Sequence, residues 1–163
     1  MNIHDLIRSG LVRRWHANPD LAWTGETNGH HQWVVASLIA ALNPNASAAL
    51  LVEAIWHDVG EVMAGDLPAP FKAENPELAA AHAEFEHAQR KRICGQRYLS
   101  VTEHLWLVLA DRLAAQLWML AHRSDIAGRD GWPEARAQLL MTAHTLGCRD
   151  RVRDLMVRAE GAA

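Results

Sequence analysis

The sequence contains only two cysteines among its 163 residues, Cys94 and Cys148, and they lie far apart. Neither belongs to a CxxC pair, so we predict neither a disulfide framework nor a zinc ribbon and expect a reducing, cytoplasmic location. No apolar run approaches the 18 or more residues that a membrane span requires. The first residues show no apolar core followed by a cleavage site, so we expect no signal peptide and no contact with membranes.

An excess of charge of one sign is also missing. Sixteen Lys and Arg residues stand against nineteen Asp and Glu residues, which gives a formal net charge of −3. Proteins that bind bulk nucleic acid usually have a basic excess, so we exclude that class. With 50% apolar and 21% charged residues the chain is not expected to be disordered. Its length is typical of one domain, and we expect residues 1–163 to form a single one.

Strand signals are nearly absent as well. No stretch alternates apolar and polar side chains over six residues with β-branched enrichment, whereas helical spacing recurs along the chain. We therefore predict an all-α fold, a compact helical bundle. The expected helices cover residues 2–8, 30–42, 48–59, 76–93 and 133–146, with a last amphipathic stretch to about residue 158. A further helix, capped by Ser100 or Thr102, is expected to end at about His122. Residues 12–15 are read as helix or turn, 17–29 as an irregular loop and 65–70 as a rigid extended loop.

Ionisable residues gather in the third of these helices. His57 and Asp58 are adjacent in an apolar segment, and Glu61 follows His57 by four residues. Such spacing brings side chains close together on a helix. Burying several ionisable groups in an apolar segment costs free energy unless their charges are neutralised. A bound divalent cation is one common way to neutralise them. The alternative is a capped helix end with a surface histidine.

Two further residues extend this pattern. His31 follows a turn-rich loop, and Asp111 interrupts the apolar run at residues 107–110. Taken singly, Asp111 would pair with an arginine such as Arg112, and His31 would be a core or capping residue. Together with His57 and Asp58 they give the order H…HD…D.

With this order, the sequence resembles the HD-domain metal-dependent phosphohydrolases, which have the same order of ligands on an all-helical scaffold. The stretch at residues 56–72, with its Gly65-Asp66-Leu67-Pro68-Ala69-Pro70-Phe71-Lys72 loop, and the pair Arg14-Trp15 are similar to the group that contains the bacterial 5′-deoxynucleotidase YfbR and the phage dATP triphosphohydrolases called DatZ. The resemblance covers about residues 10–123. It implies an HD-type helical bundle that hydrolyses deoxynucleotides with a divalent metal.

The resemblance also implies roles for individual residues. The implied metal ligands are His31, His57, Asp58 and Asp111, and the implied catalytic acids are Glu61 and Asp66. Arg14 and Lys72 would bind phosphate, Trp15 would crowd the 2′ position of the sugar, and Pro70 would form a wall of the base pocket. Taken alone, Arg14 and Lys72 would be surface cations and Trp15 a core residue. A set of two imidazoles and two carboxylates suits Co, Mn, Zn, Ni or Fe.

Three positions depart from the pattern of the resembling group. His30 stands where an acidic residue often precedes the first ligand, which leaves open an alternative histidine ligand or changed support for the metal. Val108 stands where a lysine often lies near the phosphate, so Arg112, His104 or a neighbouring subunit would have to replace it. Ala17 is small, which leaves the base preference open.

The chain is short like the phage dATP triphosphohydrolases, and arginines on its helices would reach a phosphate site at a symmetric interface. We therefore favour a dATP triphosphohydrolase that releases triphosphate and acts as a homo-oligomer, in which a neighbour completes the phosphate site. The alternative is a 5′-deoxynucleotidase that releases phosphate from deoxynucleoside monophosphates, because Arg14 and Lys72 are the only clear cations near the motif. A phosphodiesterase is disfavoured by the loop motif and the small size. A non-catalytic nucleotide-sensing module is disfavoured because binding alone does not need the complete set of histidines and acids.

Overall fold

The computed structural model describes residues 1–161, and within them it contains eight α-helices, three short 3-10 helices and no β-strand. The only β feature of this range is an isolated antiparallel bridge between Arg13 and Thr27. The all-α prediction is therefore confirmed. The chain forms two compact units, which are described separately: Met1–Trp33 with Glu53–Tyr98, and Val34–Val52 with the chain from Leu99 onward.

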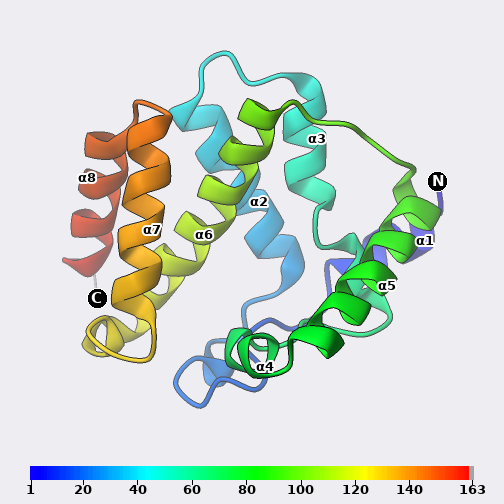
Figure 1. Cartoon of the computed structure of the whole chain (residues 1–163), viewed down its shortest axis with the longest axis horizontal. Coiled ribbons are helices and arrows are strands. Elements are labelled where there is room, and N and C mark those ends of the chain that lie inside the picture. The colour runs from blue at the N-terminus through cyan, green and yellow to red at the C-terminus, as the bar shows by residue number, and fades with distance from the viewer. Residues whose placement is uncertain (162–163) are drawn as a thin grey trace. The chain divides into compact units, whose positions relative to one another are not determined.

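The first unit is built on the long helix α5 (Figure 1). Its elements are α1 (Ile3–Ser9), η1 (Ala22–Thr24), the start of α2 (Asn28–Leu42), the end of α3 (Ala48–Trp56), η2 (Val59–Val62), α4 (Ala69–Glu74) and α5 (Pro76–Cys94). Helices α1 and α4 and the short helix η2 all pack on α5. Val59, Ile93 and Cys94 form an apolar cluster there. The backbone N–H of Asn2 donates to the Ile93 carbonyl at 2.8 Å, which ties the start of α1 to the end of α5.

The approach of η2 to α5 requires a glycine. A β-carbon on Gly60 would lie 2.2 Å from the backbone carbonyl oxygen of Glu86, far inside van der Waals contact. Because Gly60 lacks that atom, the short segment from Asp58 to Glu61 lies directly against the backbone of α5.

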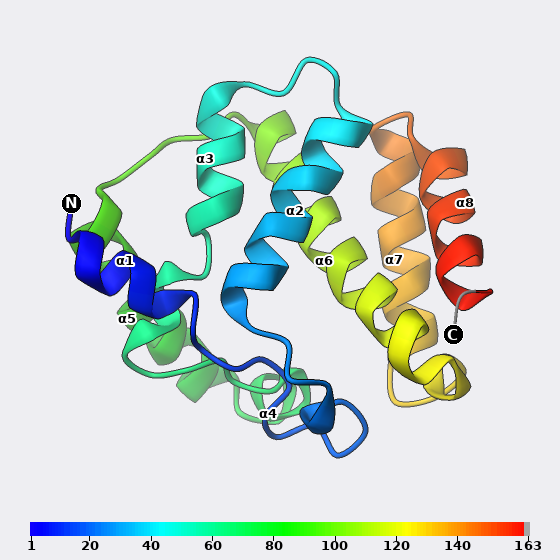
Figure 2. The same ribbon diagram turned by 180° about the vertical axis from the view of Figure 1, so that it is seen from behind.

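The second unit contains three helices that lie side by side in both ribbon views (Figure 2). They are α6 (Val101–Arg123), α7 (Trp132–Thr145) and α8 (Arg149–Glu160), with η3 (Ser124–Ile126) after α6. Their contacts bury Leu113, Leu120, Leu139 and Met156. Helix α6 begins with a capping box, in which Ser100 accepts from the backbone of Glu103 and Glu103 accepts from the backbone of Ser100. Within residues 1–161, no helix combines the length and the apolar character that crossing a bilayer requires.

Several predicted boundaries are wrong. Helix α3 ends at Trp56, so His57 and Asp58 follow the helix instead of lying within it. The apolar residue Val59, which extended the helical pattern, is buried by contacts with α5 and not by continuation of α3. The rigid loop ends at Pro68, because Ala69 and Pro70 form the first turn of α4, where a proline needs no hydrogen-bond donor. Of the two alternatives for residues 12–15, the helical one is wrong, because Arg13 pairs with Thr27.

Candidate metal and catalytic site

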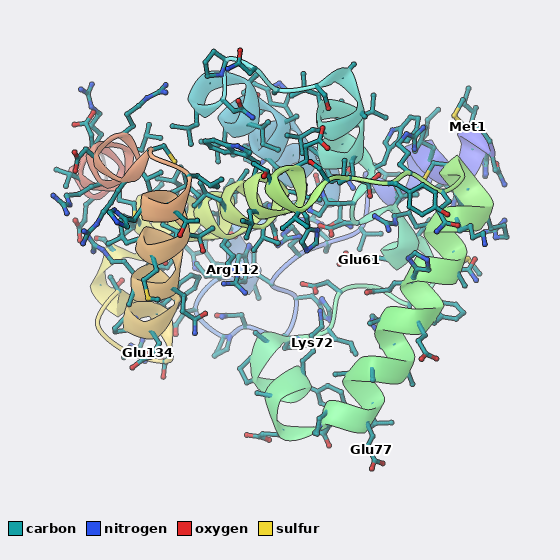
Figure 3. All side chains as sticks on the ribbon, turned by 45° about the horizontal axis from the view of Figure 1, so that its top comes forward. Met1, Glu61, Lys72, Glu77, Arg112 and Glu134 are labelled. Atoms are coloured by element: carbon teal, nitrogen blue, oxygen red, sulfur yellow. The ribbon has the colours of Figure 1, made fainter. Side chains whose placement is uncertain are left out.

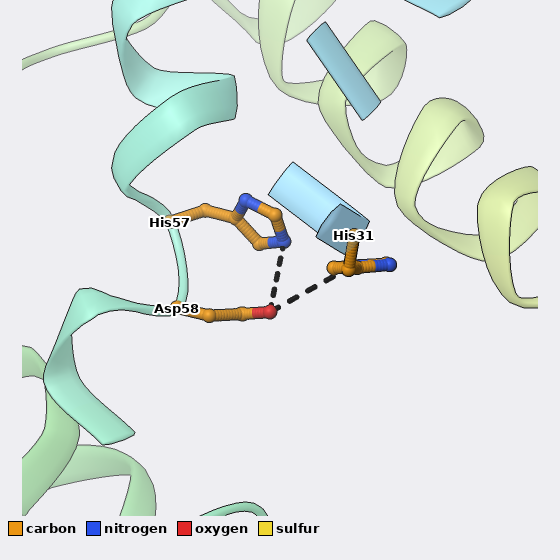
Figure 4. A group of neighbouring side chains, drawn as sticks. All are labelled: His31, His57 and Asp58. Carbon is orange, nitrogen blue, oxygen red and sulfur yellow. Dashed lines mark ion pairs between the residues drawn. The ribbon is translucent and has the colours of Figure 1, made fainter. Parts of the chain in front are cut away.

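Three of the predicted metal ligands lie together in the first unit (Figure 4). Each of His31, His57 and Asp58 offers a ligand atom within 4.8 Å of the others. The Asp58 Oδ2 atom lies 3.2 Å from Nε2 of His57 and 3.7 Å from Nε2 of His31. Two ring nitrogens therefore face the same carboxylate oxygen.

The end of α3 sets the orientation of the His57 ring. The last carbonyls of a helix lack partners within the helix, and the Ala54 carbonyl oxygen lies 2.8 Å from Nδ1 of His57. With the proton on Nδ1 donated to this carbonyl, Nε2 holds the lone pair and faces Asp58, as a metal ligand requires. His31 is fully buried. Two imidazole nitrogens and a carboxylate oxygen fit a divalent transition metal.

Arg14 reaches the same carboxylate from another segment. Its Nη1 donates to Asp58 Oδ2 at 2.8 Å, and its side chain is only 11% exposed. The position follows from the backbone, because the Arg14 N–H donates to the Glu26 carbonyl at 3.0 Å beside the bridge between Arg13 and Thr27. A guanidinium group thus lies directly beside the predicted ligands.

Glu61 is a buried acid beside this group. The amide Nδ2 of Asn28 donates to Glu61 Oε2 at 2.7 Å, and Asn28 is itself fully buried. Burial raises the pKa of Glu61 to about 8, with further increases from the charges of Asp58 and Asp66. The Asn28 hydrogen bond and Arg14 act in the opposite direction. Burial thus favours the protonated form of this carboxyl group.

The remaining predicted residues of the first unit lie on neighbouring segments. Lys72, on α4, lies 3.6 Å from Asp66 through its Nζ and the Oδ1 atom, and both side chains are half-buried. Figure 3 labels Lys72 on α4 and Glu61 on the segment after α3. Pro70 is exposed in the first turn of α4. Trp15 is half-buried, and its indole Nε1 donates to Glu26 Oε2 at 2.6 Å.

Two questions about the metal ligands follow from the sequence: whether His30 is an alternative ligand, and where Asp111 lies. Nδ1 of His30 lies 3.3 Å from Glu26 Oε1, and in the described residues the group able to hold a metal contains His31 and not His30. Asp111 is half-buried on α6, which belongs to the second unit. Its role as a fourth ligand stays a prediction.

Glu26 and Asn28 are site residues that sequence reasoning missed. Glu26 is 3% exposed and accepts a hydrogen bond from the Trp15 indole. Asn28 donates a hydrogen bond to Glu61. Both lie within the stretch at residues 17–29, where turn-forming pairs predict only an irregular loop. The available signal was an acid and an amide shortly before His31, a weak one because such residues are common in exposed loops.

The all-helical fold and the paired histidines facing Asp58 define an HD-domain phosphohydrolase. A family model described as 5′-deoxynucleotidase YfbR-like matches residues 6–126. The chain belongs to this YfbR-like family of phosphohydrolase enzymes.

Individual relatives agree with this membership. A 5′-deoxynucleotidase of Yersinia pestis is 31% identical over 162 residues, which cover 84% of this chain and 80% of the relative. A 5′-deoxynucleotidase of Vibrio cholerae is 33% identical over 100 residues, which cover 54% of this chain and 49% of the relative. The chain thus spans about half the length of the Vibrio protein and four fifths of the Yersinia protein.

Proposed function

We propose that the protein is a metal-dependent 5′-deoxynucleotidase, which hydrolyses deoxynucleoside monophosphates to deoxynucleosides and phosphate. The observation that supports this most strongly is membership of a family whose matching model and relatives have that name. The charge beside the site agrees with this proposal. Two cations, Arg14 and Lys72, suit a substrate with one phosphate group better than a substrate with three phosphate groups. The triphosphate release favoured by the sequence is therefore less well supported than its alternative.

In this proposal His31, His57 and Asp58 hold a divalent metal, with Asp111 as the predicted fourth ligand. The bound metal supplies Lewis acidity, which acidifies water and offsets negative charge on phosphate oxygens. The identity of the metal and the homo-oligomer both stay predictions.

The reaction itself is assigned to the side chains of the first unit. Water attacks phosphorus while the bond from phosphorus to the 5′ oxygen breaks. Glu61 takes the proton of the attacking water and returns it to the 5′ oxygen of the leaving deoxynucleoside. Asn28 fixes one oxygen of Glu61. Asp66 is the second acid beside the reacting phosphate, and its ion pair orients Lys72.

Phosphate binding is assigned to the two cations. Arg14 offers a planar fork of donors to two phosphate oxygens, and Lys72 adds a compact positive charge. Trp15 occupies the sugar side and excludes a 2′ hydroxyl, while Pro70 lines the base.

The proposal is tested by identifying the inorganic product. We expect the purified chain, supplied with Co²⁺ or Mn²⁺, to release orthophosphate from dAMP and to leave dATP intact, as followed by ³¹P NMR. Release of triphosphate from dATP with dAMP untouched would refute the proposal and support the triphosphohydrolase.

Trp15 provides a test of sugar selectivity. Trp15→Ala is expected to lower the ratio of activity on dAMP to activity on AMP by about tenfold, since removing a steric wall changes discrimination by an amount of that order. The measurement is kcat/KM for both nucleotides. Trp132→Ala, in the first turn of α7 in the second unit, is the control for loss of an indole. An unchanged ratio in a folded Trp15 variant would make this residue structural.

A further inference from the structure

Glu26 joins two of the residues assigned to substrate binding. Its side chain is only 1% exposed. The Oε2 atom accepts from Nε1 of Trp15 at 2.6 Å and lies 3.6 Å from Nε of Arg14. The other oxygen, Oε1, lies 3.3 Å from Nδ1 of His30. One buried carboxylate therefore contacts both members of the Arg14-Trp15 pair.

The backbone places this carboxylate by pairing two extended segments. The Arg14 N–H donates to the Glu26 carbonyl at 3.0 Å, and the Asn28 N–H donates to the Val12 carbonyl at 2.9 Å. Arg13 and Thr27 form the bridge between the two segments. Residues 12–14 are thus held in register with residues 26–28, the last of which is the first residue of α2.

Trp15 adopts a backbone conformation that needs external support. Its φ angle is +59°, in the left-handed region that is unfavourable for a residue with a β-carbon. Such conformations persist where the surroundings fix them. The hydrogen bond from the indole to Glu26 is one such contact, because it fixes the ring through its pyrrole nitrogen.

We propose that Glu26 is a positioning residue that fixes Trp15 for selection of deoxyribose and Arg14 for binding of phosphate. The inference rests on the proposed function. Because the carboxylate is buried, it acts through these two side chains and not by contact with substrate. Oε2 faces both of them, so sugar selection and phosphate affinity depend on the same atom.

Two variants of Glu26 separate its effect on Trp15 from its effect on Arg14. Glu26→Gln keeps an oxygen that accepts from the Trp15 indole but removes the charge that faces Arg14. Glu26→Leu removes both. A matched control is Glu53→Gln, because Glu53 is another buried carboxylate of the first unit and bonds an arginine, Arg90.

The experiment measures KM and kcat for dAMP and AMP with each variant. Glu26→Leu is expected to lower the dAMP to AMP ratio of kcat/KM by about tenfold, as loss of the charged hydrogen bond to Trp15 would. It is also expected to raise KM for dAMP by about tenfold, because the ion pair at 3.6 Å that orients Arg14 is lost. Its kcat is expected to stay within about threefold, because the group does not touch the reacting atoms. Glu26→Gln is expected to keep the ratio and raise KM, and Glu53→Gln to change neither.

A spectroscopic measurement reports on the position of Trp15 without substrate. The indole N–H resonance of Trp15, assigned with Trp15→Phe in a ¹H–¹⁵N spectrum, is expected to move upfield in Glu26→Leu and to stay in place in Glu53→Gln. An unchanged resonance together with an unchanged ratio overturns the inference. If Glu26→Leu does not fold, Glu26→Gln decides: a raised KM with the ratio retained supports the inference, and an unchanged KM overturns it.

The two levels of the hypothesis fail differently. If the parent chain hydrolyses dAMP and the Glu26 variants behave like the parent, only the positioning role is wrong. If the parent chain neither hydrolyses nor binds dAMP, measured by calorimetry, the proposed function and the positioning role are both overturned.

Discussion

Asp58→Ala is expected to lose bound metal and hydrolytic activity together. The Oδ2 atom of Asp58 is the point toward which His57, His31 and Arg14 all converge, at 3.2, 3.7 and 2.8 Å. Alanine removes this oxygen and leaves the Arg14 guanidinium group facing the ring nitrogens of His31 and His57. Since even residues that only support a ligand change metal affinity by about 10- to 100-fold, we expect a loss of at least about 100-fold here.

The measurements are metal content after gel filtration and phosphate release from dAMP. Asp150→Ala is the matched control, because its side chain is 94% exposed on α8 in the second unit. His57→Ala is expected to behave like Asp58→Ala. Full metal content or full activity in either variant would remove that residue from the metal site.

Glu61→Gln is expected to retain metal and to lose about 10²- to 10⁴-fold in kcat, the usual contribution of a general base. Glutamine has the shape of glutamate and keeps an oxygen for the Asn28 amide, but it cannot accept the proton of the attacking water. Glu61 accepts a hydrogen bond from Asn28, and in the described residues it lies outside the group of His31, His57 and Asp58 that could hold a metal ion.

Single-turnover kinetics and metal analysis test this role. Glu134→Gln, on the exposed surface of α7, is the control for loss of a carboxylate. Loss of metal in Glu61→Gln would make Glu61 a ligand, and unchanged kcat would remove it from the reaction.

Sequence periodicity predicted the helices with strong local signals. Helix α6 was expected from Ser100 or Thr102 to about His122, and it runs from Val101 to Arg123 with Ser100 as its cap. Where a tertiary contact decided the backbone, periodicity gave the wrong result. Val59 has helical spacing after α3, but packing on Ile93 and Cys94 buries it in a separate short helix.

The residues of the candidate site also fall into those that the sequence predicted and those that it did not. His31, His57 and Asp58 were predicted as ligands through the family resemblance that their order carries, and the structure groups them. Glu26 and Asn28 were not predicted, because their roles depend on hydrogen bonds to side chains from other segments. No spacing rule connects Glu26 with Trp15, since only the pairing of residues 12–14 with 26–28 brings them together.

Gly60 supports the candidate site through its small size, whereas the other residues of the site support it through their charges and hydrogen bonds. An added methyl group would collide with the Glu86 carbonyl, a backbone atom that cannot rotate aside as a flexible side chain does. The whole turn would have to withdraw from α5, and Asp58 and Glu61 would move with it. An inactivating substitution in this enzyme therefore need not remove a reactive group, because one extra carbon at an inert residue displaces two carboxylates at once.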